Sequence, residues 1–557
     1  MERPALLSHT EMLSGIALGL LTHVLFKRFE PALAEFSLIP IILGFIGSVI
    51  WSLSIPQTLS LVISFLSALS SSVLFYRLIA PWHPLHHVPG PFLAKCSQVW
   101  LFSRLYKGRP RVDQRVLHEK YGPIVRIGPN EVSLADAASL SVIYGGKPWV
   151  KGKSYSFTAS GGAATSETAL SSIRDHEEHK FRRRIWDRAF SISSLKEYQP
   201  AIRRRTEQLC NQLDRLSTTG SLDLQEWISY FVFDVMTDLA WGAHGGQGGG
   251  NALIEGIDPD GAIASLRYSL HLAGMTKVLP WFARYLLQFP WVTKKMKQFH
   301  IFSRQMFLNR QKRGSNPLNK SQRDVFYHLL GEGSSKGAHL SVNALQADSR
   351  QVVTGGADTT VSAITYLFYC LVCNPERFRR LQTVVDEIFK RQPHGQDIDI
   401  ETLNKEPLLD AYINEAMRLE PPIPFQNQRI VPEGGTMIRN VYLPPGTHIR
   451  SALYAISRAK ENFSCPDEFR PERWLPGERH PGEIFNAKAS IPFITGPYHC
   501  VGRNFAMQEM RYVVAFLVRR YDMRLIDGFD RKRFEEGIED RSLLEIERPL
   551  EVMIRQR

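Results

Sequence analysis

The feature that most constrains this chain is a long stretch without charge near its amino terminus. From Phe36 through Tyr76 there is no Asp, Glu, Lys or Arg, and Met12 to Phe26 is a second uncharged apolar run. A membrane-spanning helix needs about 20 mostly apolar residues. The longer run divides at a Pro-Gln pair into candidate spans near residues 36–55 and 58–76, and the shorter run reaches spanning length with its polar flanks. We therefore predict a membrane anchor over residues 1–80, with two or three transmembrane helices.

Basic residues beside these runs indicate an orientation. Lys27 and Arg28 follow the first run, and Arg77 closes the last one. Cytosolic flanks of membrane spans carry an excess of Lys and Arg. Three spans, with the first loop and the large remainder of the chain both cytosolic, fit this distribution. A cleaved secretory signal is disfavoured because apolar sequence continues far beyond the length of a signal peptide, with no clean cleavage site.

The chain after the anchor has the composition of a globular protein. Proline-rich residues 81–91 predict a stiff linker, because proline fixes φ and restricts the residue before it, and residues 92–557 form the predicted main domain. The net charge is +13 and there are six cysteines. Six cysteines in so long a chain are too sparse for a disulfide scaffold. The basic residues are dispersed and accompany no nucleic-acid-binding motif, so we predict no nucleic-acid partner.

Apolar periodicity predicts a mainly helical domain with a small β region. Helical patterns occur near residues 170–190, 198–216, 222–242, 298–312, 341–374, 376–391, 406–419 and 501–520. Strand-like segments are few and short, at Ile124 to Ile127, Glu131 to Leu134, Val441 to Leu443 and His448 to Arg450. No fixed-period repeat is visible, which argues against a solenoid.

A cysteine near the carboxyl end has the setting of a metal ligand. Cys500 stands immediately before a helical pattern, where unpaired N–H groups and the helix dipole favour a thiolate. Gly496 and Gly502 on either side would let the backbone pass close to a flat ligand. A buried cysteine alone is more often an inert packing residue. A thiolate beside a flat cavity is nevertheless the environment that a haem iron needs.

The stretch Phe493-Ile-Thr-Gly496-Pro-Tyr498-His-Cys500-Val-Gly502 resembles the haem-binding signature of the cytochrome P-450 (haem-thiolate) monooxygenases. Two further motifs occur in the order typical of that family. Glu415-Ala-Met-Arg418 is similar to its Glu-x-x-Arg helix, and Pro471-Glu-Arg473-Trp to the segment whose arginine completes a Glu-Arg-Arg network. The resemblance implies a cytochrome P-450 fold and an axial thiolate from Cys500 to the iron of haem b.

A third motif lies inside the long apolar helix near residues 341–374. Its segment Gly355-Gly-Ala-Asp358-Thr359-Thr contains two glycines, each of which costs about 1 kcal/mol relative to Ala within a helix. A helix that keeps them needs a groove there. By resemblance, Thr359 holds a water chain near bound oxygen and Asp358 gates the entry of protons. The alternative is an ordinary kink in which threonine hydroxyls bond back to earlier carbonyls.

The resemblance also assigns partners for the haem propionates. His179 and Arg183 match the family's Trp/His-x-x-x-Arg helix, and Arg429 matches the arginine that leads into its small sheet. The chain departs from the family at Tyr498, where arginine is usual, so a phenol would replace one charge-assisted hydrogen bond. Phe493, Gly496, Tyr498 and Gly502 complete the implied cofactor contacts. The substrate pocket implied by the resemblance includes Phe157, Val352, Gly355, Ile423 and Phe425.

The implied reaction inserts one oxygen atom from dioxygen into a lipophilic substrate, which the anchor and Tyr498 associate with fungal specialised metabolism. No flavin or nicotinamide fingerprint occurs in the chain, so electrons would come from a separate NADPH-cytochrome P-450 reductase, with cytochrome b5 as a further candidate donor. The implied location is the endoplasmic reticulum membrane with a cytosolic catalytic domain. Two alternatives are a haem-thiolate isomerase without net oxygenation and a non-catalytic membrane haem sensor. The sequence does not identify the substrate.

Overall fold

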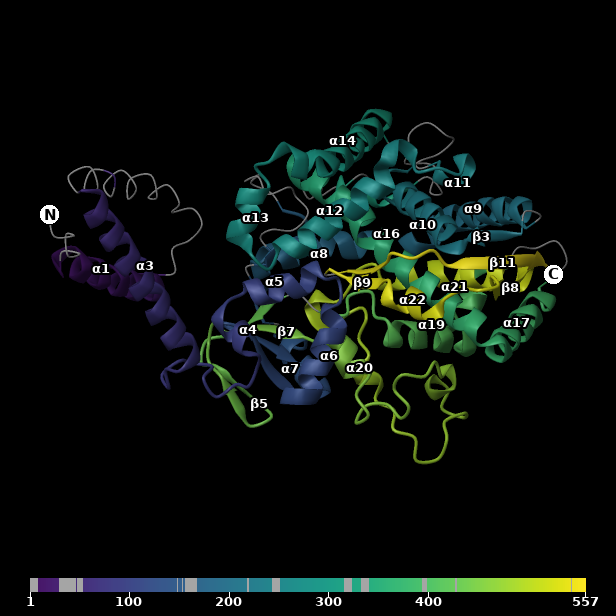
Figure 1. Ribbon diagram of the computed structural model, residues 1–557. Coiled ribbons are helices and arrows are strands. Elements are labelled where there is room, and N and C mark those ends of the chain that lie inside the picture. Colours follow the sequence, from purple (N-terminus) through teal and green to yellow (C-terminus); the bar gives the residue numbers. More distant parts are fainter. Residues whose placement is uncertain are drawn as a thin grey trace. The chain divides into compact units, whose positions relative to one another are not determined.

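The computed structural model describes residues 9–29, 47, 54–147, 149–152, 154–155, 168–217, 220–242, 251–314, 323–331, 340–392, 398–425, 428–541 and 543–557 (Figure 1). The chain divides into two compact units. The N-terminal unit consists of Met1–Trp100 with Arg126–Asn130, and the main unit consists of Leu101–Val125 with Glu131–Arg557.

Two long helices dominate the N-terminal unit. Helix α1 (His9–Phe29) contains the first apolar run, and α3 (Ile55–Leu78) contains the predicted span at 58–76. Helix α3 begins where proline occupies its first turn and the side chain of Gln57 accepts a hydrogen bond from the backbone N–H of Ser54. Among helices of the described residues, α3 and α16 of the main unit are long and apolar enough to cross a membrane, and α16 is mostly buried. The candidate span at 36–55 lies almost entirely outside the described residues.

Short elements follow α3. Helix α4 (Phe92–Cys96) and α5 (Val99–Tyr106) come after a run of turns that occupies the predicted linker. Arg126 holds this run because its guanidinium donates to the carbonyl oxygen of Arg77 at 3.0 Å and contacts the ring of His83 at 3.0 Å. The backbone N–H of Arg126 also donates to the carbonyl oxygen of Pro89.

The main unit is mostly helical, as predicted. Its helices are α6 (Pro110–Tyr121), α7 (Ala137–Tyr144), α8 (His176–Ala189), α9 (Ile192–Leu216), α10 (Leu224–Trp241), α11 (Ala252–Glu255), α12 (Ala262–Thr276), α13 (Pro280–Leu286), α14 (Pro290–Arg313), α15 (Val325–Leu329), α16 (Val342–Cys373), α17 (Pro375–Lys390), α18 (Ile400–Leu403), α19 (Pro407–Leu419), α20 (Leu453–Ser457), α21 (Arg503–Arg520) and α22 (Arg531–Glu536). Each of the eight helical patterns found in the sequence lies on one of these helices.

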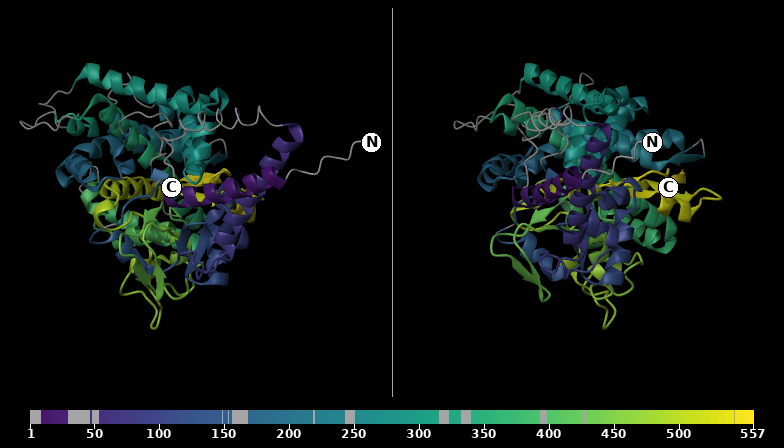
Figure 2. Two further views of the ribbon diagram at one scale, coloured as in Figure 1. Left: turned by 90° about the vertical axis from the view of Figure 1, so that its left-hand side faces the viewer. Right: turned by 60° about the vertical axis from the view of Figure 1, so that its left-hand side comes forward.

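The strands form small sheets. They are β1 (Ile124–Gly128), β2 (Glu131–Leu134), β3 (Ser221–Asp223), β4 (Arg429–Ile430), β5 (Thr436–Ile438), β6 (Val441–Leu443), β7 (His448–Ser451), β8 (Tyr521–Leu525), β9 (Ile538–Asp540), β10 (Leu544–Ile546) and β11 (Glu551–Gln556). One sheet has the order β1-β2-β7-β4, in which β2 is parallel to β7 and β4 is antiparallel to it. A second sheet, β3-β11-β8, pairs β3 with the C-terminal strands, which are yellow in Figures 1 and 2. The predicted small β region is confirmed.

Helix α16 is the central element of the main core. Ser341 caps its first turn by accepting from the backbone N–H of Ala344, and Pro375 follows the helix where it ends. Most of its side chains are buried, and it packs against α10, α19 and α21. This position explains why α16 is apolar on nearly every side. It is as hydrophobic as a membrane span because it is buried in the core of the main unit.

Candidate active site

Cys500 lies in a tight loop that ends where α21 begins. Its backbone N–H donates to the carbonyl oxygen of Phe493 at 2.9 Å, which closes the loop. Gly496 has a φ of 72°, and a Cβ atom there would stand 1.8 Å from the carbonyl oxygen of Tyr144 at the end of α7. Only glycine therefore fits at this point. The loop is held against α7, and Cys500 is fixed at the amino end of α21.

The thiol of Cys500 faces a cavity of about 330 Å³ inside the main unit. The cavity brings together most of the residues that the sequence singled out: Phe493, Tyr498, Gly502, His179, Arg183, Arg429, Thr359, Val352, Gly355 and Ile423. Gly496 does not line the cavity but packs against the backbone of Tyr144. Phe425 is buried outside the cavity, against the guanidinium of Arg450. Phe157 lies outside the described residues.

The environment of Cys500 acts on its thiol in two directions. Burial raises the pKa of Cys500, whereas the backbone N–H groups of Gly502 and Arg503 and the charge of Arg183 oppose that rise. The expected effect of the helix end is therefore present, but desolvation is larger. The thiolate form needs a further cation to stabilise it, and a bound metal ion would supply one.

A group of basic side chains borders the same cavity. Besides His179, Arg183 and Arg429, it includes Lys151, which the sequence reasoning missed. Burial and the charges of Arg429 and Arg183 lower the pKa of Lys151 to about 6. Burial, Lys151 and Arg183 lower the pKa of His179 to about 3. These shifts show that basic groups are crowded here, and that Lys151 and His179 have no ion pair with a carboxylate among the described residues.

Lys151 belongs to no local motif, so it could not be recognised from the sequence pattern. It forms an isolated β-bridge with Arg429, and its ammonium donates to the carbonyl oxygen of Ser171 at 2.9 Å. Arg429 donates to the hydroxyl of Tyr155 at 2.9 Å, and its Nε is buried without a hydrogen-bond partner among the described residues. An unpartnered buried guanidinium nitrogen is costly, so this atom is expected to meet an acceptor in the functional protein.

Tyr498 stands among these cations. Its ring contacts that of His179 edge to face, with 4.5 Å between the centroids. Lys151 Nζ lies 4.8 Å from the centroid of the Tyr498 ring, and the guanidinium carbon of Arg429 lies 5.3 Å from it. The aromatic face is electron-rich and offsets part of the crowded positive charge, which an arginine at this position would increase.

The two glycines of α16 have different roles. Gly355 is exposed to the cavity, whereas a Cβ at Gly356 would stand 2.3 Å from Cε of Met236 on α10. Thr359 also borders the cavity, and its hydroxyl donates to the carbonyl oxygen of Gly355 at 2.9 Å. The back-bonded hydroxyl weighed in the sequence analysis is thus present, and because it donates, its oxygen can still accept a hydrogen bond.

Asp358 does not border the cavity. Its carboxylate lies 3.6 Å from Nε of Arg267, in a separate small polar pocket that also contains His271, Arg541 and Glu545. Burial raises the pKa of Asp358 to about 6, against the opposing effect of Arg267. Asp358 and Thr359 are adjacent in sequence, but successive helical residues point about 100° apart, so they serve two different pockets.

The predicted Glu-Arg-Arg network is fully formed. Glu415 accepts from Arg418 Nε at 2.8 Å and from Arg473 Nε at 3.1 Å, and all three side chains are 0% exposed. Its oxygens also accept from the indole of Trp474 and the backbone N–H of Arg470. A buried charge triad is tolerable only when its polar atoms are satisfied in this way.

Glu509 on α21 is a second residue that the sequence reasoning missed. It borders the cavity and is 0% exposed to outside solvent. Neither carboxyl oxygen has a hydrogen-bond partner among the described residues, and burial raises the pKa of Glu509 to about 8. Glu509 is therefore neutral at pH 7. Glu509 therefore adds no negative charge to the cavity wall.

The haem implied by the sequence motifs fits these residues. A thiol, a group of cations without a charged carboxylate, and the glycine and hydroxyl segment of α16 all border one cavity. The lowered pKa values of Lys151 and His179 and the unpartnered Nε of Arg429 are the features that a ligand with carboxylates would correct.

Comparisons with known proteins agree with this geometry. The family model Cytochrome P450 matches residues 89–553. Cytochrome P450 67 of Uromyces fabae is 34% identical over 95% of this chain and 97% of its own length. Cytochrome P450 monooxygenase orf5 of Eupenicillium brefeldianum is 33% identical over 84% of this chain and 90% of its own. Tryprostatin B 6-hydroxylase of Neosartorya fischeri is 29% identical over 87% and 85%, respectively. This chain therefore belongs to the cytochrome P450 family, as a fungal-type, oxygenating oxidoreductase that takes a haem-thiolate cofactor.

Proposed function

We propose that this protein is a membrane-anchored monooxygenase that inserts one oxygen atom from dioxygen into a lipophilic secondary metabolite. Haem b, held by Cys500, would supply the activation of dioxygen and the oxidising chemistry. The observation that carries the proposal is the cavity in which the Cys500 thiol lies near four basic side chains, of which Lys151, His179 and Arg429 have no ion pair among the described residues. A thiolate ligand and anionic side groups are the two features of a haem-thiolate cofactor that a protein must match.

The chain's own residues would bind and orient this cofactor. Arg183 is held in place because it donates to the carbonyl oxygen of His499 at 2.7 Å and to Asp187 at 2.7 Å. Arg429, Lys151 and His179 would share the propionate carboxylates with it. The hydroxyl of Tyr498 would add a neutral hydrogen bond, while its ring keeps the cations apart from one another.

We propose that two residues of α16 supply protons to the cavity. The hydroxyl of Thr359 borders the cavity and would hold water there, while Asp358 would pass protons from its separate polar pocket. A pKa of about 6 allows Asp358 to take and release a proton near neutral pH. Because the two side chains face different pockets, the transfer requires Asp358 to move or a water to bridge the helix.

Electrons would come from a separate NADPH-cytochrome P-450 reductase, with cytochrome b5 as a further candidate. A surface groove of about 820 Å³ runs along the outer side of the Cys500 loop and is bordered by Phe493 and Arg503. Of its basic residues, Lys196 is paired with Glu401, whereas Lys405 and Lys488 have no ion pair among the described residues. The resulting positive surface suits an acidic partner.

The substrate class is inferred from the pocket and from the relatives. Val352 and Ile423 give the cavity apolar walls, and one relative is named for the hydroxylation of tryprostatin B. The apolar helix α3 supports attachment to a membrane. We place the protein in the endoplasmic reticulum membrane with the main unit in the cytosol, because the basic Arg77 closes α3 immediately before that unit.

Haem ligation is tested by spectroscopy. The reduced protein under carbon monoxide should show the red-shifted Soret band of a thiolate complex, and Cys500→Ser should lose it. Cys465→Ser, at an exposed cysteine outside the cavity, is the matched control. A retained band in Cys500→Ser would refute the assignment.

The reaction is tested with isotopically labelled dioxygen. With reductase, NADPH and a fungal extract, the label should appear in one product at one atom per molecule. A product without label would indicate an isomerase, and an absence of substrate-dependent NADPH consumption would indicate a sensor. Thr359→Ala should keep the haem and consume NADPH while forming less product.

A further inference from the structure

One side chain in the cavity wall has a free donor. Gln351 lies on α16, about two turns before Thr359, and borders the cavity together with Val352 and Gly355. Its Oε1 accepts a hydrogen bond from the hydroxyl of Ser171 at 2.6 Å. Its Nε2 has no hydrogen-bond partner among the described residues.

The direction of this donor is set by its neighbours. Because Ser171 occupies Oε1, the amide nitrogen is turned the other way. Nε2 lies 3.1 Å from the point where a Cβ on Gly355 would stand, so it is directed along α16 toward the glycine that is open to the cavity. The side chains of Val352, Ile423 and Met236, which line the same cavity, are apolar and offer no acceptor.

We propose that Gln351 is the specificity-determining hydrogen-bond donor of the substrate pocket, and that the substrates are lipophilic compounds carrying a carbonyl oxygen. A donor amide on an apolar wall strengthens the binding of a ligand that carries an acceptor, but it does not strengthen the binding of a hydrocarbon. A carboxylate would instead be drawn to the cations around Arg429. This inference rests on the proposed function, because it assumes that the cavity beside Thr359 admits substrate.

The test compares two probes of similar shape. Binding of 4-phenylcyclohexanone and of phenylcyclohexane to the holoprotein is measured by the ferric spin-state shift and by thermal stabilisation. The native protein should bind the ketone about three- to tenfold tighter, the value of one net hydrogen bond. Gln351→Leu should abolish this preference and leave hydrocarbon binding unchanged or slightly tighter. Gln346→Leu, on the same helix and outside the cavity wall, should keep it.

The outcomes separate this inference from the proposed function. A native protein without preference for the ketone, or a Gln351→Leu variant that retains the preference, would overturn the role of Gln351. Neither result affects the carbon monoxide spectrum or the labelled-oxygen experiment, which test the monooxygenase assignment by themselves.

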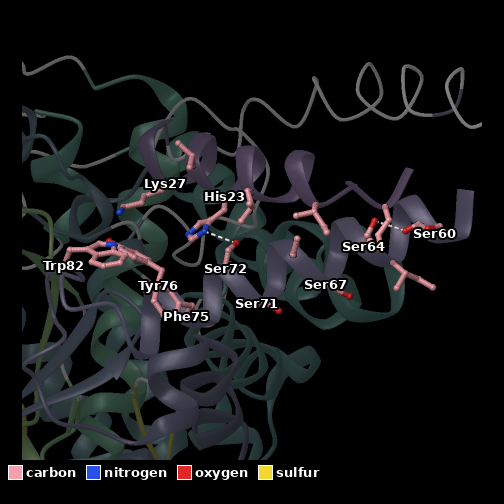
Figure 3. A pocket seen from close by; sticks show the side chains of 16 residues that line it. His23, Lys27, Ser60, Ser64, Ser67, Ser71, Ser72, Phe75, Tyr76 and Trp82 are labelled. Carbon is pink, nitrogen blue, oxygen red and sulfur yellow. Dashed lines mark hydrogen bonds between the residues drawn. The ribbon is translucent and has the colours of Figure 1, made fainter. Parts of the chain in front are cut away.

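A second inference comes from the N-terminal unit. Contacts between α1 and α3 advance in the same direction along both helices. Gln57 donates to Glu11 at 3.1 Å near the start of each helix, and the ring of His23 contacts the Ser72 hydroxyl at 3.0 Å near the end. Lys27 Nζ lies 3.9 Å from the centroid of the Tyr76 ring. The two helices are therefore parallel (Figure 3).

The packing between these helices is close. A Cβ on Gly15 would stand 2.1 Å from the Ser64 hydroxyl, and one on Gly19 would stand 2.7 Å from the carbonyl oxygen of Phe65. Glycines spaced four apart, facing small residues, are typical of helices that associate within membranes. Polar contacts such as His23 with Ser72 add hydrogen bonds where lipid offers none.

A parallel pair fixes the sides on which the helix ends lie. Lys27 and Arg77 are at the same end, which the positive-inside rule assigns to the cytosol. Helix α1 alone is not apolar enough to count as a membrane span. We propose that its packing against α3 nevertheless lets it cross the membrane beside α3, so that His9 and Ile55 both lie at the lumenal face. Both helices would then run from the lumen to the cytosol, which gives the anchor a lumenal amino terminus.

Glycosylation in microsomes tests this topology. The full chain is extended before Met1 by a flexible segment that carries an Asn-Ser-Thr acceptor, and the control carries the same segment after Arg557. The amino-terminal acceptor should be glycosylated and the carboxyl-terminal one should not. An unmodified amino-terminal acceptor that cytosolic protease removes would overturn the proposal.

Cross-linking checks the register independently. His23→Cys with Ser72→Cys, and Glu11→Cys with Gln57→Cys, should each be joined by a short bifunctional reagent. The mismatched pair Glu11→Cys with Ser72→Cys should not. Cross-linking of the mismatched pair alone would show antiparallel helices and overturn the proposed crossing of α1 beside α3.

Discussion

Lys151 Nζ lies 4.8 Å from the centre of the Tyr498 ring. The electron-rich face of the ring offsets part of the repulsion that Lys151 receives from Arg429 and Arg183. Tyr498 and Lys151 thus lie in contact although they are far apart in the sequence.

Lys151→Met is predicted to weaken haem retention. Loss of one buried charge-assisted hydrogen bond should speed haem transfer to apomyoglobin by about tenfold. Lys147→Met is the matched control, because Lys147 is exposed in the same loop. Equal transfer rates for both variants would show that Lys151 does not contact the cofactor.

Glu509→Gln is predicted to stabilise the protein at alkaline pH. Burial raises the pKa of Glu509 from 4.5 to about 8, so the folded state favours the protonated acid. Its contribution to stability is complete below pH 4.5 and is lost as the pH rises through about 8, by up to about 5 kcal/mol. Glutamine does not titrate. The melting temperature of Glu509→Gln relative to the native protein should therefore rise between pH 5.5 and 8.5.

Glu433→Gln supplies the control for that series, because Glu433 is exposed. Its melting temperature should follow that of the native protein at every pH. A constant difference between Glu509→Gln and the native protein across the series would mean that Glu509 is solvated or paired when folded.

Features that depend on neighbouring residues could be predicted from the sequence, whereas features that depend on contacts between distant segments could not. Helices such as α16 and α21 were predictable because their apolar period is local, while β9 and β10 were missed because three-residue strands acquire their meaning only from a partner. The motif around Cys500 located the cavity. Lys151 could not be found, since its role arises from a β-bridge to Arg429, far away in sequence. Asp358 was identified, but its separation from the cavity depends on the rotation of α16.

Arg473→Ala is predicted to cost about 3–5 kcal/mol of unfolding free energy, because it leaves part of a buried charge network uncompensated. Arg473 also donates to the carbonyl oxygens of Ser464 and Cys465, which alanine cannot replace. Thermal unfolding of the holoprotein measures the loss, and Arg391→Ala, at an exposed residue, is the control. A melting temperature equal to that of the control would show that the Glu-Arg-Arg network does not stabilise the fold.

The two glycines of α16 are predicted to respond differently to alanine. At Gly355 a methyl group meets only the end of Gln351, so Gly355→Ala should gain up to about 1 kcal/mol in helix propensity. At Gly356 it would stand 2.3 Å from Cε of the buried Met236 side chain, and overpacking costs about 1–3 kcal/mol. Gly356→Ala should therefore lower the melting temperature.

Met236→Ala makes room for the methyl group, so the double variant should be more stable than the sum of the single effects by about 1 kcal/mol. Strict additivity would show that Gly356 is not kept for the packing of α10 on α16.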